Sequence, residues 1–134
     1  MRLVIDTNII ISALIKNSVS RKLILDKRLE FCSPDFILVE IKKYKTEIVQ
    51  RSCLNKKEIE ILLSIILNKI EVKYKEEYEK YLTKAEQLIK DIKDVSFLAV
   101  ALSENCSIWS DDKHFDKQNK IKIYKTKDLV KFLH

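Results

Sequence analysis

Short apolar runs alternate with longer amphipathic stretches along the whole chain. The short runs predict strands at residues 2–5, 29–32, 107–109 and 121–124, and alternation of period two predicts an edge strand at 70–74. The stretches between them predict helices at residues 9–15, 20–27, 34–51, 55–68, 77–89, 94–104 and 127–133. This order is typical of an α/β protein with three layers (α/β/α), in which helices flank a mostly parallel sheet of four to five strands. We expect residues 1–134 to form a single domain.

Several helix ends carry recognisable signals. Ser33-Pro34-Asp35 reads as a helix start, with a capping hydroxyl, a proline at the first position and an acid in the first turn. Asn55 and Glu58 form a capping-box pattern. The chain has no glycine, so Asn17 and Asn105 are expected to take the left-handed conformation that ends a helix. The absence of glycine also excludes a GxGxxG turn and a P-loop.

Composition narrows the class of protein further. With 46% hydrophobic residues the chain can fill one core, and its longest apolar run, residues 61–67, is too short to cross a membrane. No signal-peptide pattern is present, so we expect a cytoplasmic protein. The three cysteines are odd in number and widely spaced, which argues for reduced thiols and against a zinc site: Cys32, Cys53 and Cys106.

The positive charge is concentrated near the C-terminus. Residues 113–134 contain seven lysines and two aspartates, whereas the first 112 residues are almost balanced at 19 basic and 18 acidic side chains. A smaller basic cluster contains Lys42, Lys43 and Lys45. Such clustering suits a polyanion partner, although a solvated lysine-rich surface explains it equally well.

Acidic side chains follow two of the predicted strands. Asp6 comes directly after the strand at 2–5, and Asp111 and Asp112 follow the strand at 107–109. Ligands bind at the carboxyl ends of strands in open α/β sheets, so these acids are candidates for chemistry. The alternative for Asp6 is a helix cap, and the alternative for Ser110-Asp111-Asp112 is a solvated turn.

Two further acids lie on predicted helices. Glu40 shares a helix side with apolar residues, which leaves either a functional carboxylate or an acid reaching solvent from the edge of the stripe. Asp91 is a good helix cap. Asp94 lies in the first turn on the side that carries Leu98, so it is either a functional carboxylate or an acid that the helix dipole stabilises. Several carboxylates brought together need a compensating cation. Oxygen ligands without support from His or Cys favour Mg²⁺ or Mn²⁺, and such ions beside a basic surface are the apparatus of phosphodiester hydrolysis.

Four segments, in this order and spacing, resemble the PIN domain family, and the resemblance extends over essentially the whole chain. They are Val4-Ile5-Asp6-Thr7-Asn8-Ile9-Ile10-Ile11-Ser12, Ser33-Pro34-Asp35-Phe36-Ile37-Leu38-Val39-Glu40-Ile41, the stretch from Asp91 to Leu102, and Ile108-Trp109-Ser110-Asp111-Asp112-Lys113-His114-Phe115. No single segment is specific; the ordered set is.

The resemblance implies a set of roles. Asp6, Glu40, Asp94 and Asp112 would be the catalytic acids, and Asp6, Asp94 and Asp112 would hold Mg²⁺ or Mn²⁺. Asn8 and Ser12 would orient Asp6, Ser110 matches a small hydroxyl residue of the family, and Asp91 would be a supporting acid. Asp112 is favoured over Asp111 because it directly precedes the Lys-His pair. Asp116 could be an outer acid one helical turn further on, but a surface role that neutralises a lysine is favoured. The C-terminal segment would face RNA through lysines such as Lys113, Lys117 and Lys120.

The expected activity is a metal-dependent endoribonuclease, as is typical of the family. Many small members are VapC-like toxins that form homodimers and are inhibited by an antitoxin. The alternatives are a PIN nuclease of RNA processing or decay without an antitoxin, and a PIN domain that binds RNA or protein without cleavage. A receiver-type phosphoacceptor domain fits poorly, because Asp6 stands alone where that domain needs a pair of acids.

Overall fold

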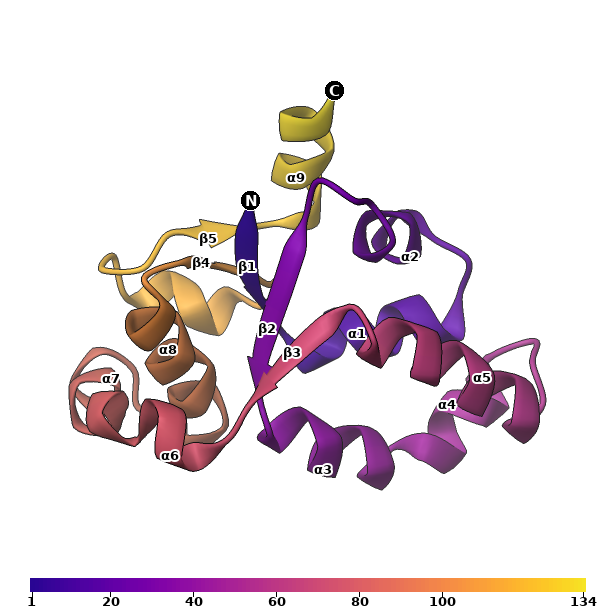
Figure 1. Ribbon diagram of the computed structural model, residues 1–134, viewed down its shortest axis with the longest axis horizontal. Helices are drawn as coiled ribbons and strands as arrows, with labels where there is room; N and C mark the ends of the chain where they lie inside the picture. Colours follow the sequence, from indigo (N-terminus) through magenta and orange to yellow (C-terminus); the bar gives the residue numbers. More distant parts are fainter.

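The computed structural model describes residues 1–134 and contains one five-stranded sheet (Figure 1). The strand order is β3-β2-β1-β4-β5, and every neighbouring pair is parallel. The strands are β1 (Arg2–Ile5), β2 (Glu30–Pro34), β3 (Ile70–Lys73), β4 (Ser107–Trp109) and β5 (Ile123–Tyr124). The predicted α/β class and strand number are therefore confirmed, and β3 is an edge strand as its alternating pattern predicted.

Helices cover both faces of the sheet. One layer is formed by α1, α2, α4 and α5, and the opposite layer by α6, α7 and α8, while α3 lies beyond the carboxyl end of β2 (Figure 1). Their bounds are α1 (Thr7–Ile15), α2 (Val19–Ile24), α3 (Phe36–Lys43), α4 (Lys45–Arg51), α5 (Lys56–Leu67), α6 (Lys75–Tyr78), α7 (Leu82–Leu88), α8 (Ile92–Glu104) and α9 (Thr126–Leu133). The structure contains no helix with the length and apolar character needed to span a bilayer.

The core lies between the sheet and these two layers. The central strand β1 is almost entirely buried, and Phe31 and Trp109 from the strands on either side of it pack with ring centroids 5.7 Å apart. Helix α8 contacts β1, β2 and β4 through a buried side that includes Ala99 and Ala101. These small side chains let the helix approach the sheet closely, which fixes the position of its first turn relative to the strand ends.

The structure confirms three of the predicted helix ends. Asn55 and Glu58 form the predicted capping box of α5. The Asp91 carboxylate accepts a hydrogen bond from the Lys93 amide and caps α8. Asn105 ends α8 in the left-handed conformation with φ of 51°.

Other predictions of helix boundaries were wrong. Pro34 ends β2 instead of beginning a helix, and the predicted helix at 34–51 is divided at Tyr44 into α3 and α4. The predicted helix at 77–89 is interrupted by a 3₁₀ turn, η1 (Glu79–Tyr81), directly after Tyr78. Tyr78 is buried and donates a hydrogen bond to Asp35, a long-range contact that local patterns do not reveal. Asn17 is not left-handed, because the chain leaves α1 through an extended Lys16.

Candidate metal centre

A pocket of about 270 Å³ lies beyond the carboxyl ends of β1 and β4, where α1, α3 and α8 meet. All four acids that the sequence singled out for catalysis line it, although they come from four separate segments of the chain. Its lining residues are Asp6, Thr7, Asn8, Glu40, Tyr44, Asp91, Lys93, Asp94, Phe97, Asp112 and His114. The parallel sheet explains this convergence, since β1 and β4 are neighbours and both end at the same edge.

Ser110 connects the two acids that follow β1 and β4. Its buried hydroxyl donates a 2.7 Å hydrogen bond to Asp6 Oδ2 and accepts one of 3.0 Å from the Asp112 amide. The Asp6 amide in turn donates to the Trp109 carbonyl at 3.1 Å. The side chain of Asp6 and the backbone of Asp112 are therefore held in a fixed relation before any ligand arrives.

Glu40 is positioned by Thr7, a residue that the sequence reasoning did not select. The Thr7 hydroxyl, in the first turn of α1, donates a 2.6 Å hydrogen bond to Glu40 Oε1. This bond fastens α3 to the start of α1, and it orients a carboxylate that is only partly buried. A threonine directly after a strand-end acid was the available signal, but it is equally common as a helix start.

Asp94 is buried in the first turn of α8, with 8% of its surface exposed. Its Oδ2 atom is buried and has no hydrogen-bond partner. A buried carboxylate oxygen without a partner is costly, so this atom favours either a proton or a cation. Phe97, one turn further along α8, adds an apolar wall to the same pocket.

Burial and mutual repulsion shift the titration of both buried acids. Burial and the nearby charges of Asp112 and Glu40 raise the pKa of Asp6 to about 6, against the opposing effect of the hydrogen bonds from Ser110 and the Asn8 amide. Burial, followed by the charges of Asp91 and Asp112, raises the pKa of Asp94 to about 6. Both shifts have the sign expected when burial and neighbouring carboxylates disfavour the charged form of an acid.

These observations together fit a divalent cation. The donor set around Asp6, Asp94 and Asp112 is composed of carboxylate oxygens, one of its buried oxygens accepts no hydrogen bond, and the clustered acids raise one another's pKa. Hard oxygen donors of this kind suit Mg²⁺ and Mn²⁺.

Asp111 and Asp112 have different surroundings despite being adjacent. Asp111 accepts hydrogen bonds from the amide and hydroxyl of Thr126, at 2.7 and 2.6 Å, and so holds the start of α9. It does not line the pocket, whereas Asp112 does. Asp116 is exposed and pairs with Lys125 at 3.2 Å. The geometry therefore favours Asp112 as the pocket acid and places Asp111 and Asp116 in structural contacts.

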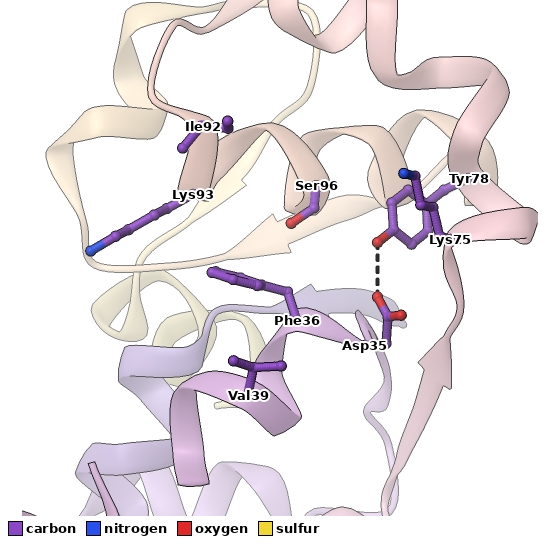
Figure 2. Close-up of a pocket in the computed structure, with 8 residues that line it drawn as sticks. All are labelled: Asp35, Phe36, Val39, Lys75, Tyr78, Ile92, Lys93 and Ser96. Carbon is purple, nitrogen blue, oxygen red and sulfur yellow. Dashed lines mark hydrogen bonds between the residues drawn. The ribbon is translucent and has the colours of Figure 1, made fainter. Parts of the chain in front are cut away.

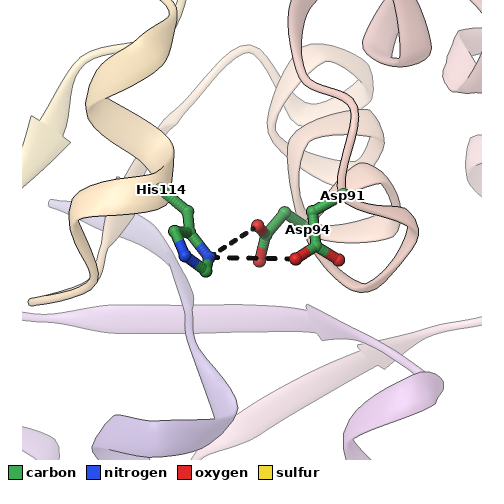
Figure 3. A group of neighbouring side chains, drawn as sticks. All are labelled: Asp91, Asp94 and His114. Atoms are coloured by element: carbon green, nitrogen blue, oxygen red, sulfur yellow. Dashed lines mark ion pairs between the residues drawn. The ribbon is translucent and has the colours of Figure 1, made fainter.

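His114 is a site residue to which the sequence pattern assigned no role; it entered as part of the Lys-His pair that follows Asp112. It lies in the 3₁₀ turn η2 (Lys113–Lys117), and its Nδ1 atom is 3.4 Å from Asp94 Oδ2 and 3.9 Å from Asp91 Oδ2 (Figure 3). One ligand atom from each of Asp91, Asp94 and His114 lies within 4.8 Å of the others. His114 Nδ1 also lies 3.5 Å from Asp112 Oδ1, so the histidine stands at the mouth of the acid cluster.

The remaining predicted supporting residues lie at different distances from the acids. Asn8 lines the pocket, and its backbone N–H donates to the Asp6 carboxylate. Ser12 lies on an exposed part of α1 and does not line the pocket, so the structure does not bring it to Asp6. Asp91 lines the pocket and caps α8 at the same time.

Only some of the lysines that were predicted to face RNA lie near the acids. Lys117 lines an adjoining hollow together with Lys90, Asp91, Asp94 and His114. Lys113 is exposed beside Asp112, and Lys120 is exposed in the following loop and lines neither hollow. Lys93 and Lys90, which the sequence reasoning missed, lie next to the acids because the first turn of α8 and the residues before it face the pocket.

A family model described as "PIN domain" matches residues 4–129 of the chain. The chain belongs to the PIN domain family. The resemblance inferred from the four segments is thereby confirmed. Among solved structures, one match is a chain from a crystal structure of VapBC2 from Rickettsia felis bound to a DNA fragment from its promoter. The likeness has a TM-score of 0.67 at 19% identity and covers 93% of this chain and 98% of the other. No curated protein matched the chain.

Proposed function

We propose that this PIN domain is an endoribonuclease that depends on Mg²⁺ or Mn²⁺. The observation that carries the proposal is the convergence of four carboxylates in one pocket, where a buried oxygen of Asp94 accepts no hydrogen bond and lies 3.4 Å from His114 Nδ1. Membership of the PIN family supports a nuclease, and the lysines around the pocket suit a polyanionic substrate.

In the proposed reaction each pocket residue has a separate role. Asp6, Asp94 and Asp112 would hold the metal ion, which activates water and neutralises charge on the phosphodiester when it is bound. Ser110 keeps Asp6 in place, and Thr7 keeps Glu40 at the edge of the pocket. Glu40 completes the acid set or positions the attacking water. Lys93 and Lys117 would attract the phosphates, and Lys113 and Lys120 would extend the basic rim.

The direct test is cleavage of a labelled RNA by purified protein in millimolar Mn²⁺ or Mg²⁺. The same reaction with EDTA in place of the metal is the negative control. Asp112→Asn should lower the rate by about 100-fold or more, because the loss of a metal ligand affects both binding and chemistry. Asp116→Asn is the matched control, since Asp116 lies on the neighbouring turn and pairs with Lys125. Equal loss in both variants, or cleavage that persists in EDTA, would contradict the proposal.

We further propose that the nuclease is the toxin of a toxin–antitoxin pair and forms a homodimer. Support comes from its fold similarity to a chain of VapBC2, a complex whose structure was solved with promoter DNA. Induced expression should arrest growth, Asp112→Asn should not, and co-expression of the protein encoded next to this one should restore growth. If the active enzyme is harmless when it is expressed alone, a role in RNA processing or decay is the better explanation.

A further inference from the structure

A second pocket has a volume of about 420 Å³ and is larger than the acid pocket (Figure 2). It lies between α3, α6 and α8, and Lys93 lines both pockets. The two pockets are built from the same helices, since Val39 precedes Glu40 on α3 and Ser96 follows Asp94 by two residues on α8. A ligand in the larger pocket would therefore lie next to a ligand bound at the acid pocket.

Its walls are mainly apolar and include an aromatic ring. Phe36 and Val39 rise from α3, and Ile92 faces them from the first turn of α8 (Figure 2). Val39 and Ile92 are 62% and 86% exposed, and with Phe36 they form an exposed apolar patch beside a polar site. The volume lies within the range of roughly 300–1,000 Å³ that is common for small-molecule sites.

The pocket contains few polar groups, and they differ in whether they already have a hydrogen-bond or ion-pair partner. Asp35 is already engaged, because it accepts a 2.8 Å hydrogen bond from the Tyr78 hydroxyl. Ser96 Oγ is buried and has no hydrogen-bond partner. Lys75 and Lys93 lie at the two ends of the pocket in Figure 2, and neither forms an ion pair within 4.0 Å.

We infer that this pocket binds a nucleobase of single-stranded RNA, adjacent to the phosphate held at the acids. The inference rests on the proposed nuclease function and names a subsite for that substrate. A base is flat and apolar on its faces and polar at its edge, which matches an aromatic and aliphatic wall with one unpartnered hydroxyl. The unpaired lysines supply positive charge for the phosphates on either side of such a base, and a purely apolar protein partner would not require them.

The test measures nucleotide binding by NMR, on metal-free protein with labelled isoleucine, leucine and valine methyl groups. Uridine or adenosine 5′-monophosphate should shift the methyl signals of Val39 and Ile92 through the ring current of the base, whereas ribose 5-phosphate should not. Leu38 is on the same helix but does not line the pocket, so its signal is the internal reference. Absence of shifts, or equal shifts with ribose 5-phosphate, would overturn the inference.

Variants separate recognition of the base from other effects. Phe36→Leu keeps the apolar volume but removes the ring, and it should weaken nucleotide binding by about tenfold, since stacking on an aromatic ring is a large part of base binding. Val39→Ala, at an exposed position, should weaken binding severalfold and serves if Phe36→Leu does not fold. Leu38→Ala should bind as the wild type does. If Phe36→Leu instead changes the molecular mass in solution, the surface is an interface between copies of the chain, and the inference is wrong.

RNA cleavage separates this inference from the proposed function. If nucleotides bind in the pocket but RNA is not cut, the base subsite stands and the nuclease proposal fails. If RNA is cut with unchanged KM by Phe36→Leu, the nuclease proposal stands and the subsite fails. If the nuclease proposal and the base subsite are both correct, Phe36→Leu should raise the KM for RNA and leave kcat nearly unchanged.

Discussion

Asp94→Asn should make the metal-free protein more stable, while it removes the response to metal. The raised pKa of Asp94, about 6 against an ordinary value of 3.8, means that its charge is harder to carry in the folded protein than in the unfolded chain. A difference of about two pKa units corresponds to ~3 kcal/mol. Loss of the favourable contact between an anion and the helix N-terminus offsets up to about 1 kcal/mol of this gain. The net expectation is on the order of 2 kcal/mol, or roughly 6–10 °C in Tm for a domain of this size.

The pH dependence follows from the direction of the shift. Because the folded-state pKa is raised, wild-type stability is highest below pH 4 with respect to this group and is lost as the pH rises through about 6. The gain from Asp94→Asn should therefore be present at pH 7.5 and absent at pH 4. Thermal unfolding in EDTA, followed by circular dichroism at both values, measures it. The exposed Asp116→Asn is the control and should shift Tm little.

A Tm for Asp94→Asn in EDTA at pH 7.5 that is equal to or below that of the wild type would refute this reasoning. Such a result would mean that neither burial nor the neighbouring acids disfavour the charge of Asp94, and the argument for a cation would lose its electrostatic basis. The same variant should cleave almost no RNA, so stability and activity are expected to change in opposite directions.

Three further outcomes are expected from the same pocket. Millimolar Mn²⁺ should raise the Tm of the wild type, by an amount equivalent to about 2.7 kcal/mol if its concentration is 100 times the Kd, and calorimetry with increasing Mn²⁺ checks this. Ser110→Ala should lower stability by about 1–3 kcal/mol and weaken Mn²⁺ binding, because Asp6 and the Asp112 amide lose a buried partner; unchanged calorimetric affinity would argue against this role. Asp111→Ala should cost about 1 kcal/mol of unfolding free energy through the freed Thr126 groups and leave cleavage intact, whereas a loss of cleavage in a folded variant would return Asp111 to the site.

Local patterns predicted the parts of the fold that depend on local chemistry. The apolar runs give the strands, and the capping signals at Asn55, Asp91 and Asn105 place helix ends correctly. The breaks after Tyr44 and Tyr78 could not be predicted in the same way. Tyr78 is drawn into the core by a hydrogen bond to a residue 43 positions earlier, so the interruption of its helix has a tertiary cause.

The residues of the candidate site also differ in whether local sequence patterns could predict them. The acids could be selected because two follow strands and two occupy apolar helix sides, and the parallel sheet brings them together. His114 and Lys93 could not, because His114 reaches the pocket through the orientation of the short turn η2 and Lys93 is an exposed lysine in the first turn of α8. Ser12 shows the converse: the resemblance selects it, but α1 directs it to solvent.

The most direct test of the metal centre is diffraction from crystals grown with Mn²⁺, with data collected near the manganese absorption edge. An anomalous peak within coordination distance of Asp6, Asp94 and Asp112 is the predicted result, and it should disappear in Asp94→Asn crystals. A peak bound only by Asp91 and His114, or no peak in the pocket at saturating Mn²⁺, would contradict the proposed metal centre.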